Sequence, residues 1–218
     1  MKNIFTILAL TIGFSMNAQP FWFQGAGSGA IQTNYATASG YASRAIGRGT
    51  TASGDFSTAM GGTASGRAST AMGGSTTASG DYSTAMGFDT QASGNVSTAM
   101  GLFTEASGSY STAMGNGSEA SGFISTAMGS STTGSGNVST AMGAGTTAIG
   151  DYSTAMGRST TASDFGSLVI GQYNSSGSSV TSDATSFNIA NTAFVIGNGT
   201  YSSNTSDAFK VMFNGDAT

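Results

Sequence analysis

Apolar residues recur along the chain at a fixed interval, and this pattern outweighs every other feature of the sequence. The motif Ser-Thr-Ala-Met-Gly occurs eight times, with successive copies 14 residues apart from Met72 onward. A second version, Thr-Ala-Ser-Gly, stands between the copies, so the underlying step is seven residues. A short fixed period predicts a repeat architecture rather than a globular domain. The methionines of the eight copies are Met60, Met72, Met86, Met100, Met114, Met128, Met142 and Met156.

Each unit has the alternation of a β-strand. In the copy at 83–87, the serine, alanine and glycine fall on one face, and the threonine and methionine fall on the other. A helix is excluded because a glycine at every seventh residue would cost about 1 kcal/mol each. The dipeptides that join the units place glycine beside Asp or Asn, as in Gly80-Asp81, and therefore predict corners.

Two strands and two corners in 14 residues make one coil of a flattened parallel β-solenoid. We expect an all-β fold of about ten such coils over residues 36–171, stacked at about 4.8 Å per coil into a rod segment of about 45–50 Å. Residues 19–35 are then an N-terminal cap segment and residues 172–218 a C-terminal capping segment.

The face assignment predicts one solvated and one apolar outer face of the coil. Small side chains point inward, so the methionines lie outside as an apolar stripe, which a soluble monomer does not normally expose. On the opposite strand, outward serines such as Ser79 and Ser93 keep that face in water. The stripe predicts self-association into a closed symmetric oligomer. The alternative is that methionine fills the inside of each coil.

Corner positions carry most of the aromatic residues and vary most between repeats. An aromatic ladder along a rod could bind protein, glycan or an abiotic surface. The alternative is that these side chains shield the coil ends or fill gaps between subunits. The candidate surface-binding ladder consists of Phe56, Tyr82, Tyr110, Phe123 and Tyr152.

Composition removes several classes of function. Only 7% of residues are charged, yet 13 Phe, 7 Tyr and the strict spacing argue against a disordered linker. The chain has no His and no Cys, which excludes a Ser-His-Asp triad and disulfides; we expect no enzyme and no cofactor. A net charge of −4 disfavours nucleic acid and anionic lipid as partners.

Calcium is also disfavoured. The repeat lacks the Gly-rich, Asp-containing nonapeptide that holds Ca²⁺ in other solenoids. Glu105 and Glu119 are 14 residues apart, so they should stack on adjacent coils as a solvated pair.

The first residues resemble a secretory signal. Lys2 precedes an apolar run that is too short to span a bilayer, and Ala18 ends a plausible cleavage site. Residues 1–18 are therefore expected to be a signal peptide, and the protein to be exported to the cell surface or the extracellular space, with no membrane insertion by this chain.

The repeats resemble the YadA-like head repeats of trimeric autotransporter adhesins. Residues 83–94 read Ser-Thr-Ala-Met-Gly-Phe-Asp-Thr-Gln-Ala-Ser-Gly, close to the 14-residue unit of that family. The resemblance implies a left-handed parallel β-roll, a homotrimer with the methionines facing the trimer axis, and a role as a non-enzymatic adhesin head. Members of the family continue into a stalk and an anchor, so a truncated sequence is expected.

Two other functions remain open at this point. The first is the structural shaft of a phage-tail-fibre-like protein whose C-terminal chaperone domain is missing. The second is an ice-binding β-solenoid, since threonines form part of a rank on the outer face. Gln91, Glu105 and Glu119 interrupt that rank.

Overall fold

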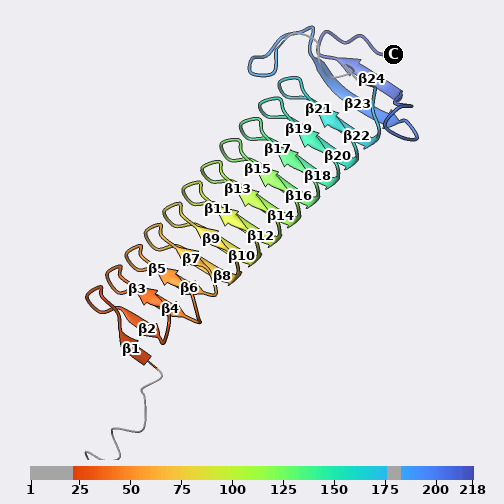
Figure 1. Ribbon diagram of the computed structural model, residues 1–218. Coiled ribbons are helices and arrows are strands. Elements are labelled where there is room, and N and C mark those ends of the chain that lie inside the picture. The colour runs from red at the N-terminus through yellow and green to blue at the C-terminus, as the bar shows by residue number, and fades with distance from the viewer. Residues whose placement is uncertain (1–21, 176–182) are drawn as a thin grey trace, which may run out of the picture.

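The chain forms an elongated stack of coils, as Figure 1 shows for a computed structural model that describes residues 22–175 and 183–218. The expected signal peptide, residues 1–18, lies outside the described residues. Within those ranges the regular structure consists of 24 β-strands and no helix. No helix there is long and apolar enough to cross a membrane.

The strands belong to two sheets that run along the rod. Sheet A has 14 strands and sheet B has 10. In order, sheet A contains β1 (Trp22–Gln24), β2 (Ile31–Thr33), β4 (Arg44–Ile46), β6 (Thr58–Met60), β8 (Thr70–Gly74), β10 (Thr84–Phe88), β12 (Thr98–Leu102), β14 (Thr112–Asn116), β16 (Thr126–Ser130), β18 (Thr140–Ala144), β20 (Thr154–Arg158), β22 (Leu168–Gln172), β23 (Thr192–Asn198) and β24 (Asp207–Met212).

Sheet B is built from shorter strands of two residues. It contains β3 (Thr37–Ala38), β5 (Thr51–Ala52), β7 (Thr63–Ala64), β9 (Thr77–Ala78), β11 (Gln91–Ala92), β13 (Glu105–Ala106), β15 (Glu119–Ala120), β17 (Thr133–Gly134), β19 (Thr147–Ala148) and β21 (Thr161–Ala162).

Coils stack in register, which confirms the predicted parallel solenoid. In sheet A, Met86 pairs with Met72 on one side and with Met100 on the other. In sheet B, Ala92 pairs with Ala78 and Ala106 in the same way. Equivalent residues of successive repeats therefore form straight columns, about 4.8 Å apart along the rod. The two versions of the seven-residue unit correspond to the two sheets.

The interior of the coil accepts only small side chains. The alanine columns of both sheets are buried, and so are the serine that precedes each sheet A strand from β4 to β22 and the threonine that precedes most sheet B strands. Ser83, Ala85, Thr90 and Ala92 are one such set. The prediction that serine and alanine point inward is confirmed.

The prediction for the glycine after methionine is wrong. Gly87 is exposed and has a φ of 129°, so the strand departs from regular alternation at this residue. A Cβ added at Gly87 would collide with the carbonyl oxygen of Gly101 in the next coil. Glycine recurs after every methionine because the neighbouring backbone occupies the place of a side chain.

One coil is two residues shorter than the others. The missing residues are taken from the end of β6, which stops at Met60, whereas the later sheet A strands of the repeat are five residues long. Gly62 then occupies the buried column between Thr50 and Thr76: its carbonyl accepts the N–H of Thr51 at 3.1 Å. A side chain at Gly62 would collide with Thr76. The corner of this coil is therefore closed at Gly62 with two fewer residues.

The two ends of the stack are closed by different devices. At the N-terminal end, β1 folds back antiparallel on β2. At the C-terminal end, β23 continues sheet A parallel to β22, and β24 then turns back antiparallel on β23. The buried alanine column ends there in Val169 and Val195.

Side chains, rather than another strand, end sheet B. The carboxamide of Asn174 accepts the N–H of Thr161 at 2.8 Å and donates to the carbonyl of Thr161 at 3.2 Å. Asp164 stands where earlier repeats have the buried glycine, and its carboxylate accepts the N–H of Thr192 at 2.7 Å. Close by, hydrogen bonds from Thr185 lower the pKa of Asp183 below its ordinary value.

The buried glycines of the Ala-x-Gly units provide a direct test of coil spacing. A Cβ at Gly94 would overlap the carbonyl of Gly108, although the φ of Gly94 is ordinary. We expect Gly94→Ala to reduce the free energy of unfolding by about 2 kcal/mol or more, since the coils must separate to admit the methyl group. Urea unfolding followed by circular dichroism measures this change.

Ser93→Ala is the matched control. Ser93 is the adjacent residue and points into solvent, so its substitution should change stability by no more than about 0.5 kcal/mol. Equal stability of the two variants would contradict the close stacking of the coils at Gly94.

Candidate interaction surfaces

The methionines of the repeat form one straight column on the outer face of sheet A. Parallel pairing places Met60 beside Met72, and the column continues in register through the later copies. Its interior members are half-buried. The end members, Met60 and Met156, are 42% and 39% exposed. Methionine as filler of the coil interior is excluded, because alanine, serine and threonine occupy that space.

Isoleucine extends this column beyond the methionines. Ile46 pairs with Met60 at the N-terminal end, and Ile170 pairs with Ile196 at the C-terminal end. We call the set from Ile46 to Ile196 the apolar column. Beside it lies a column of half-buried threonines, such as Thr84 and Thr98, whose pairing follows the same register. The outer face of sheet A therefore has no charged residue from β6 to β18 except at its corners.

The outer face of sheet B is hydrophilic. Ser79 and Ser93 are exposed, as predicted, and so are Glu105 and Glu119. The two glutamates are register partners in adjacent strands, which confirms that they stack. Like charges opposite each other are unfavourable, and solvent exposure reduces the repulsion. Ile149 interrupts the serines and is 43% exposed.

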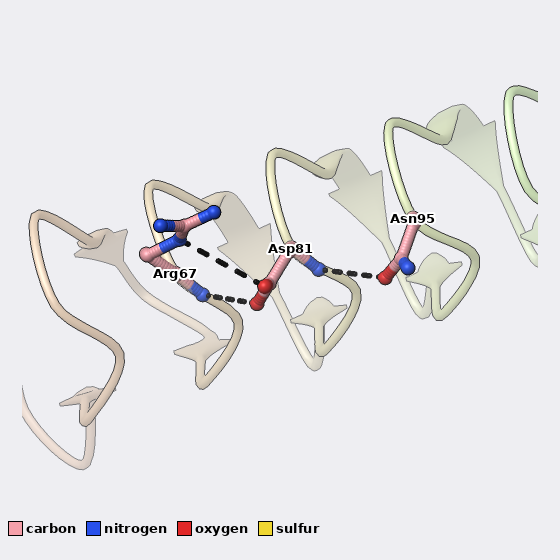
Figure 2. A network of polar contacts seen from close by, with 3 residues as sticks. All are labelled: Arg67, Asp81 and Asn95. Atoms are coloured by element: carbon pink, nitrogen blue, oxygen red, sulfur yellow. Dashed lines mark hydrogen bonds and ion pairs between the residues drawn. The ribbon is translucent and has the colours of Figure 1, made fainter.

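A hydrogen-bonded polar column runs along the corner that leads from each sheet B strand to the next sheet A strand; we call this the first corner. The N–H of Arg67 donates to Oδ1 of Asp81 at 2.8 Å, and the N–H of Asp81 donates to Oδ1 of Asn95 at 3.3 Å (Figure 2). The same link joins Asn137 to Asp151 at 2.8 Å. Asp and Asn side chains thus satisfy backbone donors that the corner leaves unpaired.

Ionic attraction adds little to this column. Nε of Arg67 lies 3.8 Å from Oδ2 of Asp81, but the two side chains are 55% and 48% exposed. An exposed pair of this kind contributes at most about 1 kcal/mol. The guanidinium of Arg67 also lies over the ring of Tyr82, 4.8 Å from its centroid. The column is therefore held chiefly by its backbone contacts.

A second column at the first corner is apolar. Its members occupy the residue that follows the polar position in each coil, and we call it the corner ladder: Ala42, Phe56, Ala68, Tyr82, Val96, Tyr110, Ile124, Val138 and Tyr152. From Phe56 onward, its large side chains are 38–58% exposed. Four of the five predicted ladder residues belong to it.

Phe123 does not lie in the corner ladder. It occupies the polar column instead, and its N–H donates to Oδ1 of Asn137 at 3.3 Å. Its ring nevertheless packs edge-on against Tyr110 of the preceding coil, with centroids 5.7 Å apart. Phe123 therefore supplements the ladder from the adjoining column.

Every member of the corner ladder has left-handed backbone geometry, with φ between 51° and 60°. This region favours glycine and asparagine, and for β-branched residues such as Val96 and Ile124 it is strongly disfavoured. The opposite corner, between sheet A and sheet B, adopts a similar geometry mostly with Gly, Asp or Ser, such as Asp89 and Gly117, but it has aromatic residues at Tyr35, Phe103 and Tyr173. The apolar side chains of the first corner are therefore not explained by local backbone preference.

The described residues offer no metal-binding cluster. They include no group of three or more His, Cys, Asp and Glu residues that could hold a metal ion. The carboxylates of Asp55, Asp81 and Asp151 each accept a backbone N–H of the preceding coil, which is a structural role.

Comparison with protein families agrees with this geometry. The model of the YadA head domain repeat, which spans two copies of the unit, matches residues 38–63, 64–90, 79–104, 92–118, 106–132 and 148–174. These stretches cover more than half of the chain. The chain belongs to the YadA head repeat family. A search of curated proteins found no match.

Membership of the YadA head family describes a module of the trimeric autotransporter adhesin kind, which is structural rather than enzymatic. The surfaces described above are accordingly interpreted as contact surfaces. Sequence reasoning missed the polar column at the first corner, although the 14-residue spacing of Asp81 and Asn95 was available to reveal it. It could not reveal the left-handed geometry, since phenylalanine, tyrosine and valine are not signals for it.

Backbone strain in the corner ladder leads to a prediction about stability. We expect Val96→Asn to raise the free energy of unfolding by about 0.5–1 kcal/mol, because asparagine tolerates the left-handed region and valine does not. Thermal unfolding followed by circular dichroism measures the shift.

The control is Asp89→Asn at the opposite corner, where φ is 52° and the native aspartate already tolerates the left-handed backbone. This variant should stay within about 0.5 kcal/mol of the parent. A destabilised Val96→Asn protein would show that packing of the valine outweighs its backbone strain.

Proposed function

We propose that this protein is an exported, homotrimeric adhesin head that attaches its bearer to an extracellular target. The observation that carries the proposal is the apolar column of sheet A. It runs unbroken from Ile46 to Ile196 in one direction, and every member retains exposed area in a single chain. A contiguous exposed apolar surface of this length marks an interaction site.

A closed symmetric assembly suits the column. Because the column is straight and parallel to the rod, three copies arranged around an axis can each present it inward along its full length. Each methionine that loses its remaining exposure would contribute up to roughly 1 kcal/mol, so a column of this length sums to a stable interface. Three subunits and a left-handed coil are the form expected for this family, and we adopt both.

The rest of the surface suits attachment rather than catalysis. Sheet B remains hydrophilic, which keeps the assembly soluble, and the corners stay available to contact a target. The corners recur in every coil along the rod, so a target can contact several coils at once.

Charge placed in the apolar column should break the assembly. We expect Met86→Asp, Met100→Asp, Met114→Asp and Met128→Asp, combined in one chain, to convert the trimer to a monomer, since a buried unpaired carboxylate is strongly unfavourable. Sedimentation equilibrium measures the mass of the assembly.

The matched control replaces Ser79, Ser93 and Ser107 by Asp on the outer face of sheet B, which should leave the mass unchanged. Met→Ile at the same four positions is a second control, because the column already contains Ile46 and Ile170. A parent protein that sediments as a monomer would overturn the proposed assembly.

Export is open to a separate measurement. If residues 1–18 are removed on secretion, the mature protein should begin at Gln19. Mass spectrometry of the exported protein gives its N-terminus. An intact Met1 in the exported protein would exclude the cleavage.

A further inference from the structure

The corner ladder has apolar side chains although its backbone is left-handed, a geometry that favours glycine and asparagine. Aromatic residues with positive φ occur at both corners, but only the first corner combines Phe56, Tyr82 and Tyr110 with β-branched residues in this geometry. Those three aromatic side chains are 56%, 51% and 55% exposed. Arg67 lies over the ring of Tyr82, and Tyr41 and Phe123 pack edge-on with Phe56 and Tyr110, so contacts within the chain use about half of their surface. The remaining half faces solvent along one edge of the rod.

Three of the four aromatic members of the ladder follow a regular spacing, and the fourth, Tyr152, lies outside it. Phe56, Tyr82 and Tyr110 stand on alternate coils, with the smaller Ala68 and Val96 between them. Two coils advance by about 9.6 Å along the rod. An extended β-1,4-linked hexopyranose chain advances by a closely similar length for every two sugars. Three aromatic rings spaced two coils apart can therefore lie beneath every second sugar of a straight polysaccharide.

Aromatic rings suit the apolar faces of such sugars. In β-1,4-linked glucose or N-acetylglucosamine the ring substituents are equatorial, which leaves axial C–H groups on each face. These C–H groups pack on the electron-rich face of an aromatic ring, while a tyrosine hydroxyl keeps contact with water or with a sugar hydroxyl. An α-linked, coiled polymer does not repeat in a straight line and cannot follow the three rings.

The flank of the ladder has charges of both signs beside Phe56 and Tyr82, where the polar column consists of Asp55, Arg67 and Asp81, and no charge along the stretch that follows. From Asn95 to Val138 the first corner contains no charged residue, and its polar column there consists of Asn95, Ser109 and Asn137, interrupted by Phe123. Oδ1 of Asn95 accepts the N–H of Asp81, which leaves the carboxamide N–H groups to donate to a ligand. The net charge of −4 disfavours an acidic polymer. The carboxylates of Asp55 and Asp81 already accept backbone N–H groups, and the edge has no run of charges of one sign, so it matches a neutral ligand.

We propose that the corner ladder binds a straight, neutral β-1,4-linked polysaccharide of the glucan or chitin type, with Phe56, Tyr82 and Tyr110 stacking on every second sugar. The inference rests on the proposed role as an attachment module, and it names the chemical class of the target. The ladder and the apolar column act independently, because they lie on different parts of the coil.

The experiment uses the purified protein with insoluble cellulose and chitin in a pull-down, and with their soluble hexasaccharides in titration calorimetry. Starch and maltohexaose serve as α-linked comparisons. The protein should bind at least one β-1,4-linked polymer and neither α-linked one. The combined Tyr82→Ala and Tyr110→Ala variant should lose at least about tenfold in affinity, whereas Tyr82→Trp should retain binding because it preserves the aromatic face.

Phe88→Ala combined with Phe103→Ala is the matched control. These two residues form an edge-on aromatic pair at the opposite corner, with centroids 6.2 Å apart, and their loss should leave binding unchanged. Val96 lies between two rings of the ladder, so the variant Val96→Asn also tests the strained position. This variant should weaken binding and raise the midpoint of thermal unfolding. Circular dichroism verifies that each variant is folded.

Light scattering on the same samples separates the outcomes. A trimeric parent that binds no β-1,4-linked polymer would overturn the inference and leave the proposed assembly intact. A tyrosine variant that falls apart into monomers would also overturn it, since the ladder would then be an interface between copies. A monomeric parent that binds cellulose or chitin through the two tyrosines would support the inference and overturn the proposed trimer.

Discussion

The spacing between coils constrains everything else in this molecule. Successive coils pair in register through parallel backbone hydrogen bonds, so equivalent residues lie about 4.8 Å apart and the two sheets of one coil lie close together. Between them the repeats place only alanine, serine, threonine and glycine, and valine appears at the C-terminal end as Val169 and Val195. Little apolar area is buried inside, and backbone pairing rather than a hydrophobic core holds the stack. Larger apolar side chains are consequently found outside, where they are free to contact other molecules.

Much of the architecture was predictable because the period of the sequence is the period of the structure. The parallel solenoid, the buried alanines and the outward methionines all follow from the 14-residue step. Gly87 was misplaced because strict alternation was assumed to continue to the end of the strand, where the backbone in fact turns to a positive φ. The corner geometry was not predictable, since Val96 and Tyr110 contradict the local preference for glycine or asparagine. Asp164, which replaces a buried glycine, was a visible sign of the end of sheet B.

The two candidate surfaces differ in the kind of neighbour that they suit. The apolar column has the same residue type in nearly every coil, so it suits a partner with the same repeat, which another copy of the chain supplies. The corner ladder varies between aromatic and aliphatic residues and alternates with polar groups, as a surface for a foreign ligand would. The hydrophilic outer face of sheet B suits neither role. In the proposed function and inference, a single coil thus offers one edge for assembly and another for recognition.

Identical register from coil to coil also makes the length of the rod an adjustable property. Loss or gain of one 14-residue unit would join the same residues above and below the change, and the caps at β1 and β24 would remain as they are. The two-residue shortening at Gly62 shows that even an imperfect unit is accommodated without loss of register. Duplication within the gene can therefore set the reach of the protein in steps of about 4.8 Å, with no redesign of either end.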